Sequence, residues 1–353
     1  MAKGPYKMSV LKWKIIDKRI PTDVEKAYKQ IINKNNFPAA NQINFLQPIL
    51  DIFFKDNDYV HAILLKDESP VYVFPIVRYK MKKFGITWWE LGFPFHKHIN
   101  LTMLHSDLSD NMFDELLVLL EDHFETWSRF AFRNIQIDSH TMEYSGDVAW
   151  FSTENELNKI VSKKNLRNIK RLEKKLITEY SSINFEFHKE NLETPLTRFS
   201  KLELHSWKGD DGVAIDSDNK TKQLYENLAN NDSNMFISEL WINQKLIAGS
   251  IGFHISETLY IHKISYSEDF SQFAPGNILL LKLLELAIDS NDIKILNLVT
   301  RPNWANRWHP NTGKVFNYVK YRSNISGKFL KLLIQQWRDI KPRLKSILKP
   351  TSN

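Results

Sequence analysis

The sequence contains no cysteine among its 353 residues. Disulfides, cysteine-ligated zinc, iron–sulfur clusters and a thiol nucleophile are therefore excluded. Only 11 glycines and 13 prolines are present, which excludes collagen-like and low-complexity chains. By contrast, 22 Phe, 12 Tyr and 10 Trp are typical of a folded globular chain. This length predicts about two domains.

Long hydrophobic runs are also missing. No stretch reaches the roughly 18–20 consecutive apolar residues that a transmembrane helix needs. The N-terminus, MAKGPYKMSVLKWK, has charges but neither the apolar core nor the small-residue cleavage site of a secretory signal. We therefore expect a cytoplasmic protein, with a peripheral position at the inner face of the membrane as a variant.

The net charge of +7 is unevenly distributed. Residues 158–175 hold eight Lys or Arg against one Glu, and residues 314–353 hold ten against one Asp, so the rest of the chain is acidic. The first segment is either a solvated helix face or a contact for an anionic ligand. The second is either packed on the protein or lies on an anionic membrane.

Two halves of the chain show a similar order of expected elements. In the first half we expect helices at 22–34 and 43–54, then short strands rich in aromatic and β-branched residues at 59–65, 70–79 and 84–91. A helix at 110–130 and a strand at 133–138 follow. The second half repeats that order: helix 162–179, strand 183–188, helix 192–207, strands 235–242, 246–255 and 258–266, helix 276–290, strand 293–299. The pattern predicts an α+β fold rather than a doubly wound sheet.

A boundary near 145–160 divides the chain into expected domains at 1–150 and 151–325. Within 326–353 we expect a basic amphipathic helix that covers about 327–346 and breaks near Pro342.

The connection between the last two strands of the second half carries the most chemical information. A strand ends at Tyr266, Gln272 lies in the loop, Pro275 suits the first turn of a helix, and Gly276 allows close approach to the backbone. N–H groups at such a helix start bind a phosphate or pyrophosphate. The alternative is a plain strand–loop–helix connection.

This loop resembles the acyl-CoA pyrophosphate loop of GNAT-type acyltransferases, whose pattern is Gln/Arg-x-x-Gly-x-Gly/Ala. Gln272 fits the first position, while Pro275 and Asn277 replace the small residues on either side of Gly276. Within that superfamily the chain is similar to the cellulose-biosynthesis acetyltransferase-like (CelD/BcsL) family, which is related to the Fem-type aminoacyl ligases. Segments 162–176, 202–216 and 259–270 agree with it.

The resemblance implies two tandem GNAT-like domains, each a mixed, mostly antiparallel sheet flanked by helices. It also implies that acyl-CoA, as acetyl-CoA or a longer thioester, binds in the second domain and that no metal is needed. The expected cofactor contacts are Ile264, Ser265, Tyr266, Gln272, Phe273, Ala274, Pro275, Gly276 and Asn277. Backbone N–H groups near Ser265 and Tyr266 are the natural oxyanion and pantetheine contacts.

One segment departs from the family pattern of an Asp, an Arg-Gly and then Tyr-Lys-x-x-Trp. After the strand at 293–299 this chain has Asn297 at the Asp position, Trp304 at the Tyr and Ala305 at the Lys, and only Trp308 is retained. Any role that the lysine has in relatives is therefore absent here, and the substrate class is left open.

Direct acyl transfer needs a base, oxyanion donors and positioned reactants. Glu203, His205 and Asp211 are the candidate bases, or else simply the end of a helix. Tyr266 is a candidate proton donor to the leaving thiolate, or else a packing residue. The expected acceptor contacts are Trp207, Lys208, Lys263, Arg301, Trp304 and Trp308. Strand alternation predicts that Lys263 and His262 point to opposite faces.

Three functions remain open. The leading one moves an acyl group from acyl-CoA to an amino or hydroxyl group of a cell-envelope or polysaccharide precursor, with a small-molecule or lipid-linked sugar as acceptor. In the second, the donor is an aminoacyl-tRNA, as in Fem-type ligases, and the basic helix grips RNA. The third is a non-enzymatic binding module.

His96 and His98 share a face but have no third ligand at a convincing spacing, so no metal is expected.

Overall fold

The computed structural model describes residues 11–17, 20–26, 29, 43–54, 58–83, 85–94, 110–135, 142–154, 156–232 and 234–347. His96 and His98 lie outside these residues. The elements of the first half are β1 (Leu11–Asp17), α2 (Ile43–Phe53), β2 (Tyr59–Lys66), β3 (Ser69–Lys83), β4 (Ile86–Gly92), α3 (Asp110–His123), β5 (Arg129–Ile135) and β6 (Met142–Ser152).

The second half begins with a helix-rich region. Its helices and strands are α4 (Leu157–Ile160), α5 (Lys163–Tyr180), β7 (Ile183–His188), α6 (Glu193–Leu204), α7 (Trp207–Asp210), η2 (Ile215–Ser217) and α8 (Asn219–Asn231). They are followed by β8 (Met235–Ile242), β9 (Lys245–Ile255), β10 (Thr258–Tyr266), η3 (Glu268–Phe273), α9 (Pro275–Asp289), β11 (Ile295–Asn297), η4 (Asn303–Trp308), β12 (Asn311–Tyr321) and α10 (Ile325–Ile347).

All the described strands belong to one twelve-stranded sheet, in the order β1-β2-β3-β4-β5-β12-β6-β11-β10-β9-β8-β7. Among them, β4–β5 and β10–β11 are the parallel pairs, and each pair is joined through a helix, α3 or α9. The remaining pairs are antiparallel, so the expected α+β fold is confirmed. The same strand–helix–parallel-strand unit occurs once in each half, as a tandem arrangement requires.

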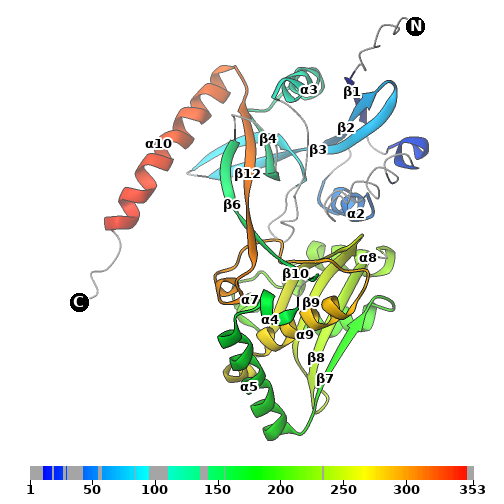
Figure 1. The fold of residues 1–353 in the computed structure, drawn as a ribbon. Helices are drawn as coiled ribbons and strands as arrows, with labels where there is room; N and C mark the ends of the chain where they lie inside the picture. Colours follow the sequence, from blue (N-terminus) through cyan, green and yellow to red (C-terminus); the bar gives the residue numbers. More distant parts are fainter. Residues whose placement is uncertain are drawn as a thin grey trace, which may run out of the picture.

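Two long strands connect the lobes seen in Figure 1. β12 pairs with β5 on one side and with β6 on the other, although it follows the whole second half in sequence. β6 also pairs with β11, and so continues the sheet from one half to the other. Because the sheet is continuous, the division at residues 150 and 325 remains a prediction.

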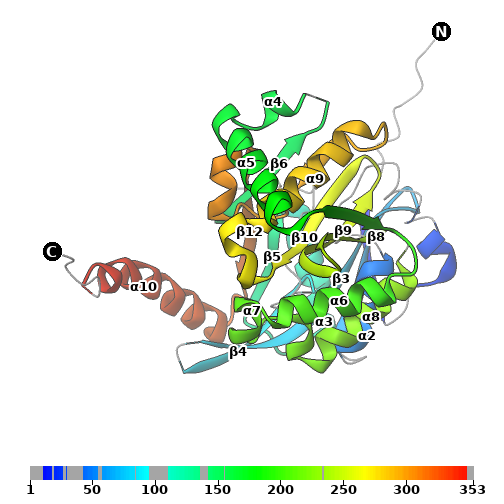
Figure 2. The same ribbon diagram turned by 90° about the horizontal axis from the view of Figure 1, so that it is seen from below.

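Helices cover both faces of the second-half sheet (Figure 2). α9 is rich in leucine, is buried on most sides and packs with α5 on one face, where the core includes Leu176 and Leu280. α6, α8 and α2 cover the other face, where Phe199, Tyr225 and Phe45 are buried. α2 comes from the first half and packs on both, since Leu46 belongs to the first-half core and Phe45 to the second.

Gly252 explains why glycine interrupts β9. A Cβ at this position would lie 2.2 Å from the carbonyl oxygen of Tyr260 and 2.3 Å from the ring of Phe236. Glycine is required here because neighbouring strand and side-chain atoms leave no room for a larger residue.

Several expected boundaries were wrong. The segment near 145–160, where a domain boundary is expected, holds the last part of β6 and the short helix α4. The helix expected to reach residue 130 ends at His123, and the next strand begins at Arg129 rather than at 133. α8 and β12 were missed. α10 does not break near Pro342 but continues to Ile347.

Candidate functional site

β10 and β11 pair only where they begin. Thr258–Tyr260 is in register with Ile295–Asn297, whereas β10 continues to Tyr266 alongside β9 alone. Beyond Asn297 the chain turns away, because the Asn297 side chain accepts a hydrogen bond from the N–H of Val299 (2.7 Å), whose φ is 63°. Among the described strands, the last part of β10 therefore has a partner on one edge only, β9.

The register of β9 shows which groups lie on that edge. The N–H of Ser267 donates to the carbonyl of Ile247 (2.9 Å), so in the alternating antiparallel ladder Ser265 also faces β9. The N–H and C=O groups of Ile264 and Tyr266 face the open side instead. Of the three expected contacts on this strand, Ser265 thus directs its backbone groups to β9, whereas Ile264 and Tyr266 direct theirs to the open side.

The loop after β10 lies beside Tyr266. Ala274 has left-handed backbone angles (φ 50°, ψ 55°) and precedes Pro275 in the first turn of α9. Asn277 donates its N–H to the carbonyl of Ala274 (2.9 Å), while the N–H of Gly276 has no partner among the described residues. A Cβ at Gly276 would lie 3.4 Å from Cδ1 of Tyr266. Strand end and helix start thus meet at one place.

The remaining loop residues divide by burial. The side chains of Phe273 and Pro275 are in the core, so only their backbone is available to a ligand. Gln272 is exposed. The Asn277 side chain accepts a hydrogen bond from Nε1 of Trp308 (3.4 Å), which ties the loop to a buried residue of η4.

A buried carboxylate lies behind the open edge. Oε1 of Glu203 is 2.9 Å from the ammonium nitrogens of both Lys208 and Lys263, and Oε2 accepts the N–H of Ile215 (2.9 Å). Burial raises the pKa of Glu203, but Lys263 and Lys208 outweigh it, so the pKa is lowered. Glu203 is therefore an ionised, fully paired anion, which argues against its expected role as a general base.

Two serines connect this carboxylate group to β10. Ser265 Oγ donates to Ser206 Oγ (3.2 Å), and Ser206 Oγ donates to the carbonyl oxygen of Glu203 (2.7 Å). Lys208 Nζ in turn donates to the carbonyl of Ile264 (2.8 Å). The start of α7 is thereby fixed against the end of β10.

His262 and Lys263 face the same side of the sheet, contrary to expectation. His262 Nε2 is 2.6 Å from the hydroxyl of Tyr225, and Lys263 Nζ lies 5.8 Å from the Tyr225 ring centroid. The cause is a β-bulge between Ile261 and Lys263, which interrupts the alternation of β10.

The His262–Tyr225 pair was not predicted from sequence. Burial, with smaller contributions from Lys263 and Lys208, lowers the pKa of His262 to about 3. Burial also raises the pKa of Tyr225 well above its usual value of 10.0. Both side chains are therefore neutral at physiological pH. Leu224, Tyr225 and Leu228, which are buried at helical spacing in α8, were the available signal.

The other expected base candidates are exposed. His205 Nδ1 donates to the carbonyl of Lys201 (2.7 Å), which leaves Nε2 as the nitrogen with a lone pair. Asp211 lies at the end of α7, and Trp207 is 53% exposed. Among the described contacts, neither His205 nor Asp211 has a side-chain hydrogen bond to the Glu203 group.

In the described part of the chain, the segment after β11 is hydrogen-bonded to the loop through Trp308. Trp308 is buried and contacts Asn277, whereas Trp304 is partly exposed and Arg301 pairs with Asp147 of β6 (3.1 Å). Ala305 is fully buried. A lysine at position 305 would therefore have to enter the core, and this position is not open to a substrate.

One group of possible metal ligands occurs among the described residues. Glu186, His188 and Glu239 place their ligand atoms within 4.8 Å of one another. Arg198 Nε, however, lies 2.8 Å from Glu239 Oε1. This guanidinium neutralises the central carboxylate, so the group acts as an ion pair and not as a cation site.

The first lobe has its own buried carboxylate, at the β4–β5 pair. Glu90 accepts hydrogen bonds from Arg129 (2.9 Å) and Tyr79 (2.7 Å) and also pairs with Arg133. Both oxygens are thus occupied within the lobe, which is consistent with a structural role.

Comparisons with known proteins agree with the geometry of the second half. Residues 163–305 match the family model described as an acetyltransferase (GNAT) domain. A search of curated proteins gave no match.

Solved structures resemble almost the whole chain. FemX has 10% identity and a TM-score of 0.57, covering 91% of this chain and 99% of that one. L-PGS from Bacillus licheniformis has 11% identity and a TM-score of 0.52, covering 92% and 98%. A conserved protein of unknown function from Bacteroides thetaiotaomicron has 14% identity and a TM-score of 0.52, covering 87% and 99%. At these identities the likeness establishes the fold alone, and the GNAT description rests on the match of residues 163–305. The finer similarity to the CelD/BcsL family stays a prediction.

Proposed function

We propose that the protein transfers an acyl group from acyl-CoA to an amino or hydroxyl group of a cell-envelope or polysaccharide precursor. The observation that carries the proposal is the open edge of β10 beside the start of α9. The N–H of Ile264, the backbone groups of Tyr266 and the N–H of Gly276, which has no partner among the described residues, lie there together, while the carbonyl of Ile264 accepts from Lys208. Pantetheine amides pair with an open strand edge, and a pyrophosphate binds N–H groups at a helix start.

In this proposal the acceptor attacks the thioester carbonyl directly. A carbon–nitrogen or carbon–oxygen bond forms, the carbon–sulfur bond breaks, and the oxyanion accepts hydrogen bonds from the β10 edge. Burial and Glu268 raise the pKa of Tyr266, so its hydroxyl stays protonated and is suited to protonate the thiolate. His205 is the proposed base, because its Nε2 carries a lone pair. Glu203 holds Lys208 and Lys263 in position.

Calorimetry with acetyl-CoA and longer acyl-CoAs tests the proposal. A Gly276→Trp variant should lose binding because the indole would fill the space next to Tyr266. Gly146→Trp is the matched control, since nothing lies within 4 Å of a Cβ at that position. Failure of the wild-type protein to bind any acyl-CoA would refute the proposal.

A second candidate keeps the fold but takes its donor from aminoacyl-tRNA. The exposed face of α5 favours it: Lys163, Lys164, Arg167, Lys170 and Lys174 are all exposed, in a helix whose buried side is Ile169 and Leu176. Such a row of cations suits a phosphate backbone. This candidate predicts a tRNA complex whose affinity falls steeply as salt is raised. The double variant Lys170→Gln with Lys174→Gln should bind tRNA more weakly, and both results together would support this candidate over the first.

We also propose that α10 contacts an anionic membrane surface. Ile325, Phe329, Leu332 and Ile340 form an exposed apolar stripe, and Lys328 and Lys331 lie beside it. The helix projects from the body of the protein in both views (Figures 1 and 2). No helix in the described part of the chain is both long and apolar enough to span a bilayer. Contact would bring the protein to a lipid-linked acceptor.

A further inference from the structure

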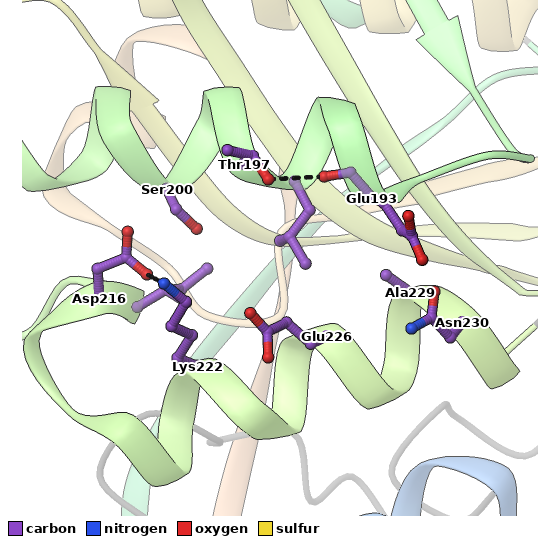
Figure 3. Close-up of a pocket in the computed structure, with 10 residues that line it drawn as sticks. Glu193, Thr197, Ser200, Asp216, Lys222, Glu226, Ala229 and Asn230 are labelled. Atoms are coloured by element: carbon purple, nitrogen blue, oxygen red, sulfur yellow. Dashed lines mark hydrogen bonds and ion pairs between the residues drawn. The ribbon is translucent and has the colours of Figure 1, made fainter.

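A pocket of about 340 Å³ lies between α6 and α8 (Figure 3). Its apolar lining comes from Leu196 of α6, Ile215 of η2 and Ala229 of α8. Leu196 and Ile215 belong to the core on the face of the sheet opposite α9, so this pocket is separate from the open edge and the loop at Gly276.

Carboxylates dominate the charge of the pocket. Glu193, Asp216 and Glu226 line it, against one cation, Lys222, which pairs with Asp216 at 3.4 Å. Glu193 and Glu226 have no ion-pair partner among the described residues. Figure 3 shows their carboxylates extending from the two helices toward the space between them. The pocket is thus anionic in a chain whose net charge is +7.

A buried hydroxyl gives an independent sign of a ligand. Ser200 is only 5% exposed, it lines the pocket, and its Oγ has no hydrogen-bond partner among the described residues. Figure 3 shows this oxygen directed into the pocket. Thr197, one turn earlier, satisfies its own hydroxyl by donating to the carbonyl of Glu193 (2.9 Å). The residue is buried but its Oγ is reached from the pocket, so an occupant of the pocket can supply the hydrogen-bond partner that the described residues do not.

We propose that this pocket binds an aliphatic ammonium ion. The alkyl chain contacts Leu196, Ile215 and Ala229, and the ammonium group lies between Glu193 and Glu226. An ammonium has three donors and no acceptor, which matches the two carboxylates; Ser200, seven residues from Glu193 along α6, is left for the second ammonium group of a diamine. Flanking carboxylates keep the amine protonated and therefore non-nucleophilic. The pocket is a recognition site for a cation and not the place of acyl transfer.

Calorimetric titration of the full-length protein with 1,4-diaminobutane tests this proposal, with 1,4-butanediol as the uncharged analogue. We expect the diamine to bind and the diol not to bind. Glu226→Gln and Glu193→Gln should each weaken the diamine by about three- to tenfold, the range for a partly exposed charged contact. Ser200→Ala should weaken it by about two- to fivefold. Glu190→Gln, an equal charge change at an exposed residue outside the pocket, should leave affinity unchanged.

Circular dichroism melts of each variant establish that the fold is retained, and Glu226→Gln is the decisive variant because its side chain is exposed. The proposal is overturned by equal affinity for diamine and diol, by Glu226→Gln affinity equal to wild type, or by no binding at millimolar diamine. None of these three results depends on acyl-CoA, so the acyltransferase proposal stands or falls separately.

Discussion

Lys208 Nζ donates a hydrogen bond to the carbonyl oxygen of Ile264 at 2.8 Å, across the edge of β10 that has no strand partner. The same nitrogen is 2.9 Å from Glu203 Oε1. One lysine from the short helix α7 therefore satisfies both a buried carboxylate and an unpaired strand carbonyl. The open edge is stable in the absence of a ligand because α7 supplies this donor.

Lys208→Met should destabilise the protein by about 1–3 kcal/mol, since the Ile264 carbonyl would lose its donor in a partly buried site. Glu203 would keep Lys263 as a partner, so the protein should still fold. Urea denaturation measures the change. Lys201→Met, at an exposed position on α6, is the control, and equal stability of the two variants would contradict the prediction.

Glu203→Gln should cost about 3–5 kcal/mol, the range for leaving buried charges without their counter-ion. The pKa of Glu203 is lowered below its ordinary value of 4.5, so the unfolded state binds the proton more tightly. Its contribution is therefore present above about pH 4.5 and is lost as pH falls through the lower folded-state pKa. The free energy of unfolding of the wild type should thus fall more steeply with decreasing pH in this acid range than that of Glu203→Gln, which has no carboxyl group to titrate there. Parallel acid dependence in both proteins would refute this.

The sequence pattern was sufficient where a strand or helix has a strong apolar repeat. The strands at 183–188, 235–242 and 258–266 and the leucine-rich α9 agree with the structure. β12 was missed because its basic and polar residues hide a strand that pairs on both sides, a fact that only tertiary structure provides. α8 was missed because its many polar residues mask the apolar spacing of Leu224, Tyr225 and Leu228.

The candidate site shows the same contrast: features that depend on chain order were predicted, and contacts that depend on tertiary packing were not. The meeting of Tyr266 with Gly276 was predicted from the order of strand, loop and helix. Pairing of Glu203 with Lys208 and Lys263 was not, since it depends on how α6 and α7 pack on β10. The bulge in β10 leaves no mark in the sequence and reverses the expected direction of one side chain.

His262 should remain neutral across the physiological range because burial lowers its pKa to about 3. Its C2–H proton resonance should not titrate between pH 5 and 8. The unfolded imidazole binds a proton near pH 6.5, so this residue should reduce stability as pH falls from about 6.5 toward 3. A Tyr225→Phe variant removes the hydroxyl bonded to Nε2 and should cost about 1–3 kcal/mol. Titration of the wild-type residue near pH 6.5 would contradict the assigned burial.

Membrane contact by α10 predicts that the protein sediments with vesicles of phosphatidylglycerol and phosphatidylcholine but not with phosphatidylcholine alone. Phe329→Asp with Leu332→Asp should abolish this without unfolding the protein, because both side chains are exposed. Gln335→Asp, which adds a negative charge at an exposed polar position of the same helix, should reduce binding far less. Lysines 328 and 331 contribute by charge, so raising the salt concentration should weaken wild-type binding. Vesicle binding that persists in the double variant would show that another surface makes the contact. If the wild type instead forms a concentration-dependent dimer that the double variant does not form, the apolar stripe serves self-association.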